Sequence, residues 1–113
     1  MAVTAAFSIA PLGGSAVGAD GSVAQAVAEV VRIVRDSGLA NETNAMFTNV
    51  EGELGEVLGL IERCIEHMAG HAPRVSVVVK LDVRPGRADA LHEKVAAVEQ
   101  LLSAGEGSPI FSP

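Results

Sequence analysis

The sequence predicts an α+β fold in which a four-stranded antiparallel sheet carries its helices on one face. Apolar residues alternate with small or polar residues over 3–10 and 75–83, which is the period of a half-buried strand. They recur every three or four residues over 23–34 and 54–68, which is the period of an amphipathic helix. With two short extended segments between them, these elements follow the ferredoxin-like order βαββαβ, and an extra C-terminal helix comes last.

The first strand is expected to end at Pro11, which cannot donate to a sheet ladder. A glycine-rich loop follows over 12–21. Ser22 has the sequence signature of a helix N-cap, because Gln25 three residues later completes a capping box. Gly38 predicts the end of this helix, since glycine readily adopts the left-handed conformation found at helix ends.

The segment 39–51 lacks helix signals and is expected to form either two short strands or one bent strand, with a turn near Asn44. A second helix is expected to start at 52–53. Gly70 and Pro73 predict its end.

The strand 75–83 shows the clearest alternation in the chain. A turn is expected at 85–87, and Asp89 is expected to cap the last helix. A single domain over 1–103 accounts for all these elements. We expect the remainder, 104–113, to form a flexible tail, because it is rich in Gly, Ser and Pro.

The composition excludes several classes of function. The 113 residues carry a net charge of −6, and their only aromatic residues are three phenylalanines. Nucleic-acid grooves need basic surfaces and stacking rings, so no nucleic-acid binding is expected. No run of about 20 apolar residues could span a membrane, so no membrane association is expected. The single cysteine, Cys64, cannot form an internal disulfide, which favours a reducing compartment and predicts a cytoplasmic protein.

The face of the sheet away from the helices favours self-association. A core without Trp or Tyr buries less area per side chain than an aromatic core. The open face carries mostly small or neutral residues, namely Ala6, Ser8, Ala10, Ser76, Val78, Lys80 and Asp82. We expect a dimer or tetramer that hides this face, with Lys80 and Asp82 in paired contacts, because an unpaired buried charge is costly.

Cys64, His67 and His71 have the spacing C-x2-H-x3-H, which a helix would bring together. Zinc can use such ligands, but a fourth ligand is absent nearby, and short motifs often match by chance. Histidines near a helix end are also explained by the negative end of the helix dipole. We therefore expect no metal and no cofactor.

The densest polar cluster on an apolar background lies at 46–53, with the sequence MFTNVEGE. Glu51 and Glu53 flank the expected start of the second helix, where the dipole favours carboxylates, so a structural role also explains them. Thr48 and Asn49 could equally be ordinary strand residues. The spacing of the polar residues supports no catalytic triad, since triads are recognised by geometry.

Five segments resemble the YkoF-like thiamine-binding proteins in sequence and in order. They are FSIAPLG at 7–13, VAE at 27–29, MFTNVEGE at 46–53, VVKLDVR at 78–84 and HEKVAAVE at 92–99. The resemblance implies a ferredoxin-like fold that forms dimers and commonly tetramers through its sheets. It also implies binding of thiamine or of its hydroxymethylpyrimidine part, without catalytic activity.

The resemblance further implies a ligand site beside the sheet, near a subunit boundary. Thr48 and Glu51 fall on the family's motif, and Ser22, with Ser15 as the alternative, falls where the family has a hydroxyl residue opening the first helix. Thr48 would give a hydroxyl to the ring and Glu51 a carboxylate to its amine or to the cationic ring. Met46 and Val50 would form part of an apolar wall, although the alternation of side chains along a strand could instead place them inside the core. The predicted ligand-binding residues are Ser22, Met46, Thr48, Asn49 and Glu51.

Two other functions stay open on sequence grounds. A ferredoxin-like enzyme of the monooxygenase or isomerase type would also dimerise through its sheet, but it would need an acid–base group in a pocket. The three histidines, at 67, 71 and 92, lie in or near expected helices, which argues against this class. The other alternative is an interaction module that binds no small ligand.

Overall fold

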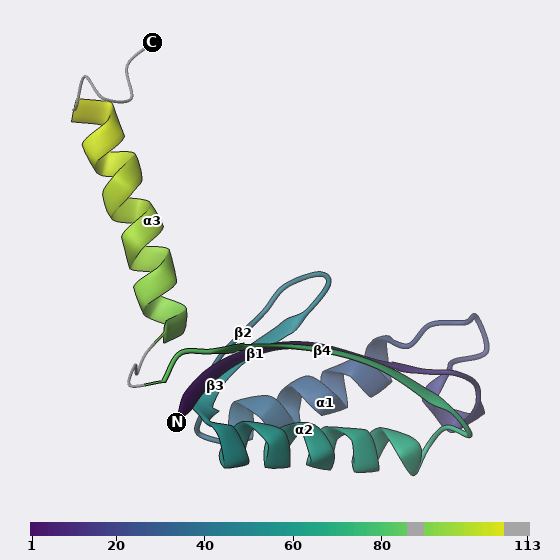
Figure 1. The fold of residues 1–113 in the computed structure, drawn as a ribbon. Coiled ribbons are helices and arrows are strands. Elements are labelled where there is room, and N and C mark those ends of the chain that lie inside the picture. The colour runs from purple at the N-terminus through teal and green to yellow at the C-terminus, as the bar shows by residue number, and fades with distance from the viewer. Residues whose placement is uncertain (86–89, 108–113) are drawn as a thin grey trace.

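The computed structural model describes residues 1–85 and 90–107 and shows the βαββαβ order followed by a helix (Figure 1). The strands are β1 (Ala2–Pro11), β2 (Ala40–Thr43), β3 (Thr48–Glu53) and β4 (Val75–Val83). The helices are α1 (Ala24–Asp36), α2 (Leu54–Ala69) and α3 (Ala90–Gly107), and a 3-10 turn, η1 (Gly14–Ala16), follows β1. The sheet order is β2-β3-β1-β4 with antiparallel neighbours, which confirms the predicted ferredoxin-like fold.

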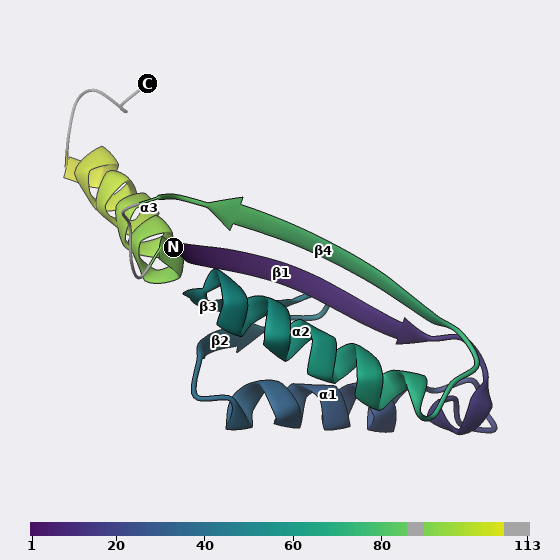
Figure 2. The same ribbon diagram turned by 60° about the horizontal axis from the view of Figure 1, so that its bottom comes forward.

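The hydrophobic core lies between the sheet and the two helices α1 and α2, which run side by side across one face (Figures 1 and 2). In the central strand β1, the alternate residues Val3, Ala5, Phe7 and Ile9 are buried under these helices. The helices contribute Ala26, Val30, Val34, Val57, Leu60, Ile61, Cys64 and Met68. Burying an aliphatic or Phe side chain stabilises the fold by about 1.5–3 kcal/mol, so this layer holds the helices on the sheet.

The start of α1 differs from the predicted capping box. The helix begins at Ala24, its N-cap is Val23, and no side chain caps it. Instead, Asp20 Oδ1 accepts the backbone N–H of Ser22 at 2.9 Å, and Ser22 Oγ accepts the N–H of Ala24 at 3.3 Å. The predicted capping box is wrong: the N-cap is Val23, and Asp20 Oδ1 accepts the Ser22 N–H that the Gln25 side chain would accept in a capping box.

Turn residues explain the middle of the chain. Gly38 has φ 81°, so the predicted left-handed end of α1 is confirmed. The segment that follows forms two strands rather than one bent strand. Asn44 makes the turn between them, because its Oδ1 accepts the N–H groups of Met46 at 2.9 Å and Phe47 at 2.8 Å.

The last helix runs further than expected. α3 continues to Gly107, so the first four residues of the expected tail, 104–107, are helical. The predicted cap Asp89 and most of the expected turn at 85–87 lie outside the described residues.

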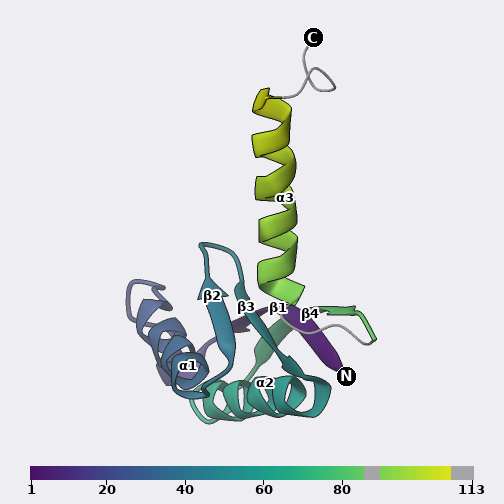
Figure 3. The same ribbon diagram turned by 90° about the vertical axis from the view of Figure 1, so that its left-hand side faces the viewer.

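A large part of the apolar surface stays uncovered within one chain. α3 projects away from the sheet on the side opposite α1 and α2 (Figures 1 and 3), and its side chains Val95, Val98, Leu101 and Leu102 are exposed. The edge strand β4 is exposed on both faces, at Val78, Val79, Leu81 and Val83. Of the predicted open face, Ser76, Val78, Lys80 and Ala10 are exposed, whereas Ala6, Ser8 and Asp82 are half-buried.

Candidate functional site

A pocket of about 230 Å³ opens between the second half of β1, the start of α1 and the β2–β3 turn. Its walls are mostly apolar, with four valines from α1 and the preceding loop facing the rings of Phe7 and Phe47. The lining residues are Phe7, Ser8, Ile9, Ala10, Val23, Val27, Val30, Val31, Thr43, Asn44, Ala45, Met46, Phe47 and Thr48. A few polar groups in an apolar pocket are typical of a small-molecule site.

Strand geometry decides which predicted residues reach this pocket. Thr48 pairs with Phe7 of β1 and is only 8% exposed, so it lies on the helix side of the sheet and lines the pocket. Met46 lines the pocket at its rim and is 73% exposed. Val50 is on the same side of β3 but is fully buried in the core, so it is not part of the pocket wall.

The two remaining residues of the predicted cluster lie on the opposite face of the sheet. Asn49 pairs with Ala6, and Glu51 pairs with Thr4, both on the face away from α1 and α2. Side chains alternate along a strand, so a small ligand bound at Thr48 cannot also contact Glu51 of the same chain. The prediction of one shared site for Thr48, Asn49 and Glu51 is therefore corrected.

Glu51 belongs to a polar row that crosses the open face. The strand register aligns Glu51, Thr4 and Asp82 across β3, β1 and β4. Glu51 is only 7% exposed, and α3 begins over this side of β1 and β3 (Figure 3). Glu51 and Asp82 each take part in a polar or electrostatic interaction.

Ser22 lies at a second cleft on the other flank of α1. This cleft has a volume of about 380 Å³ and is lined by Ser15, Ala16, Gly18, Ser22, Gln25, Ala26, Glu29 and His71. Ser15 and Ser22, the two candidates for the family's hydroxyl residue, both line this cleft, and neither lines the pocket at Thr48. The structure thus separates Ser22 from Thr48.

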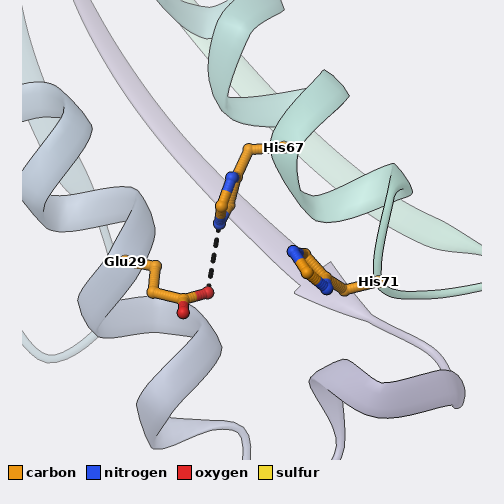
Figure 4. Close-up of side chains that lie close together, drawn as sticks. All are labelled: Glu29, His67 and His71. Carbon is orange, nitrogen blue, oxygen red and sulfur yellow. Dashed lines mark hydrogen bonds and ion pairs between the residues drawn. The ribbon is translucent and has the colours of Figure 1, made fainter.

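The predicted trio of Cys64, His67 and His71 does not assemble. Cys64 is fully buried in the core, and burial raises the pKa of its thiol to about 11. The two histidines turn instead toward α1, where Glu29 Oε2 lies 3.1 Å from His67 Nε2 (Figure 4). The spacing could not reveal Glu29, because it comes from another helix.

Comparison with known proteins now identifies the family. The sequence profile of the thiamine-binding protein family matches residues 5–99. The chain belongs to the thiamine-binding protein family. Among its relatives in this family, the UPF0045 protein Mb1933 of Mycobacterium bovis is 50% identical over 104 residues, which cover 90% of this chain and 96% of the relative.

Solved structures share the fold of this thiamine-binding family member. Protein MJ1052 of Methanocaldococcus jannaschii superimposes with a TM-score of 0.75 at 32% identity, over 87% of this chain and 96% of that chain. Protein TM0486 of Thermotoga maritima, named as a candidate thiamine biosynthesis or salvage protein, has a TM-score of 0.73 at 20% identity, over 87% and 99% of the two chains. The family is named for thiamine binding, and the name of the Mycobacterium bovis relative states no activity. Separately, none of the helices within the described residues is long and apolar enough to cross a membrane.

The raised pKa of Cys64 predicts a specific pH dependence of stability. Between pH 9.0, the ordinary pKa of the thiol, and about 11, the folded chain holds a proton that the unfolded chain loses. The folded state then binds more protons, so the free energy of unfolding should fall as the pH rises through this range. Urea unfolding at a series of pH values from about 8 to about 11 measures this fall in the free energy of unfolding. Cys64→Ala lacks the thiol and should show a shallower decline; equal slopes for both proteins would contradict the assignment.

Proposed function

We propose that this protein binds thiamine or its hydroxymethylpyrimidine part without catalysing a reaction, and that the pyrimidine ring occupies the pocket at Thr48. The observation that carries the proposal is the nearly buried residue Thr48, which brings a hydroxyl to a mostly apolar pocket of a thiamine-binding family member. The name of the Thermotoga maritima neighbour supports the same class of ligand.

The chemistry of the pocket suits an aminopyrimidine. The ring offers an amine donor and ring-nitrogen acceptors, and the Thr48 hydroxyl can pair with either kind of group. Asn44 also lines the pocket. Its Oδ1 already accepts two backbone N–H groups, which leaves its NH₂ group as the donor for a ring nitrogen. The half-buried ring of Phe47 supplies a surface for stacking.

The size of the pocket suits one ring of thiamine. Pockets for drug-sized ligands usually measure about 300–1,000 Å³. The volume here is about 230 Å³, so we place the pyrimidine inside and the thiazolium part outside, at the exposed rim near Met46.

The lining residues do not favour the enzyme alternative. A monooxygenase or isomerase needs an acid–base side chain near the reacting atoms. The lining of the pocket holds no His, Asp, Glu, Lys or Cys. We therefore propose a carrier or sensor of the ligand, acting in the cytoplasm, where the free thiol of Cys64 stays reduced.

We further propose that the protein works as a dimer or tetramer assembled through the open face of the sheet. The apolar side chains of α3 and β4 are exposed in a single chain, and exposed apolar patches mark association surfaces. Lys80 and Asp82 would then make paired contacts between subunits. Light scattering at micromolar concentration should report a dimer or a larger species, and a monomeric mass would contradict this assembly.

Replacing Thr48 tests the ligand site. Thr48→Val keeps the shape of the side chain and removes one hydrogen bond of about 0.5–1.5 kcal/mol, so the affinity should fall by roughly three- to tenfold. Calorimetric titration of thiamine and of hydroxymethylpyrimidine measures the change. Glu51→Gln is the matched control, since it lies on the same strand but faces the opposite side, and it should leave the affinity nearly unchanged.

Each other outcome of this titration has a distinct meaning. A loss of affinity in Glu51→Gln, with Thr48→Val unaffected, would move the site to the open face. No heat from the wild-type protein with either compound would reject the ligand and leave the interaction module as the remaining function. A thermal-shift series with the thiamine phosphates provides an independent readout, because a ligand of the native state raises the melting temperature.

A further inference from the structure

Glu29, His67 and His71 meet where the middle of α1 approaches the end of α2 (Figure 4). One potential ligand atom from each residue lies within 4.8 Å of the other two. Glu29 Oε2 and His67 Nε2 are 3.1 Å apart, and the two imidazole centroids are 5.1 Å apart. Two imidazoles and a carboxylate therefore point into one small space between the helices (Figure 4).

The backbone around His71 is held in place by the loop after β1. The carbonyl oxygen of His71 accepts the N–H of Ala16 at 2.9 Å and the hydroxyl of Ser15 at 3.2 Å. Gly14 allows this approach, because a Cβ at that position would lie 2.5 Å from the same oxygen. The N–H of His71 also donates to the carbonyl of Met68 at 3.0 Å. The backbone of His71 is therefore held in place, although the residue lies just beyond the end of α2.

We propose that Glu29, His67 and His71 bind one zinc ion between α1 and the end of α2. Imidazole nitrogens and carboxylate oxygens bind zinc at about 2.0–2.2 Å, which places ligand atoms roughly 3.4 Å apart in a tetrahedral site. The Glu29–His67 pair already has this separation. The three ligand atoms lie within 4.8 Å of one another, so the ring of His71 has to move by at most about 1.4 Å, which a small rotation of its side chain provides.

Three protein ligands leave a fourth position for water or another oxygen ligand. Glu29 and His71 line the cleft of about 380 Å³, so this position faces a solvent-accessible space that also holds Ser15, Ser22 and Gln25. The side chains of Glu29 and His67 are 41% and 34% exposed, which gives an ion direct access from solution. The expectation of no zinc was based on Cys64, His67 and His71 as the candidate ligands. In the fold, Glu29, which is 38 residues from His67 in the sequence, lies beside the two histidines in place of Cys64.

The zinc site is separate from the proposed thiamine pocket. Val23, Val27 and Val31 of the α1 region face the pocket, whereas Gln25 and Glu29 face the cleft. The helices also pack through an apolar core that includes Val30, Val34 and Leu60, so the chain folds without the ion. Either proposal can therefore fail without the other.

Titration calorimetry with zinc chloride on chelator-treated protein tests the site. The wild type should bind one zinc per chain. Removing an outer partner of a metal ligand costs about 10–100-fold in affinity, so His67→Ala, His71→Ala and Glu29→Gln should each weaken binding at least roughly tenfold. Glu66→Gln is the matched control, since it removes an exposed carboxylate beside His67 and should leave the affinity unchanged.

Stability and spectroscopy give readouts that do not depend on calorimetry. Zinc should raise the melting temperature of the wild type and of Thr48→Val, but not that of His67→Ala. Cobalt in place of zinc should give the visible absorption of a site with histidine ligands in the wild type and in Glu66→Gln, but not in His67→Ala. Absence of zinc binding by the wild type, or equal zinc affinity in the three ligand variants and in Glu66→Gln, would overturn the proposal.

Discussion

The alternation of side chains along β1 determines which groups of this protein can act together. β1 is hydrogen-bonded to both β3 and β4, and Val3, Ala5 and Phe7 are buried beneath the helices. A shift of the register by one residue would turn these side chains to the other face, which the buried apolar area prevents. The register then places Thr48 on the same face of the sheet as Phe7, and Glu51 on the same face as Thr4. Neighbours in sequence are therefore assigned to different surfaces with different chemistry.

α1 divides the helix side of the molecule in a similar way. Its valines close the apolar pocket at Thr48, and its Glu29 faces the polar cleft at the end of α2. A third face of the helix, with Val30 and Val34, packs in the core. One short helix therefore lines both the pocket and the cleft. The same division explains why Ser22, just before α1, lines the cleft although its neighbour Val23 lines the pocket.

Local patterns were enough to predict the elements and the fold. The period-two pattern located β1 and β4, and Gly38 marked the end of α1. The predicted ligand cluster was wrong in part. Residues 46–53 were treated as one group, although successive side chains of a strand point to opposite faces of the sheet. The predicted capping box does not form, because Asp20 Oδ1 accepts the backbone N–H of Ser22. The Glu29–His67 contact depends on how two helices pack, and no local spacing contains that information.

The proposed site for the pyrimidine ring lies on the helix side of the sheet, at Thr48. An NMR titration of the isotope-labelled protein with hydroxymethylpyrimidine tests it most directly, because amide shifts locate the ligand on the chain. The largest shifts should fall on Thr48, Phe47 and Val27, around the pocket. Shifts concentrated on Thr4, Glu51 and Asp82, across the open face, would contradict it.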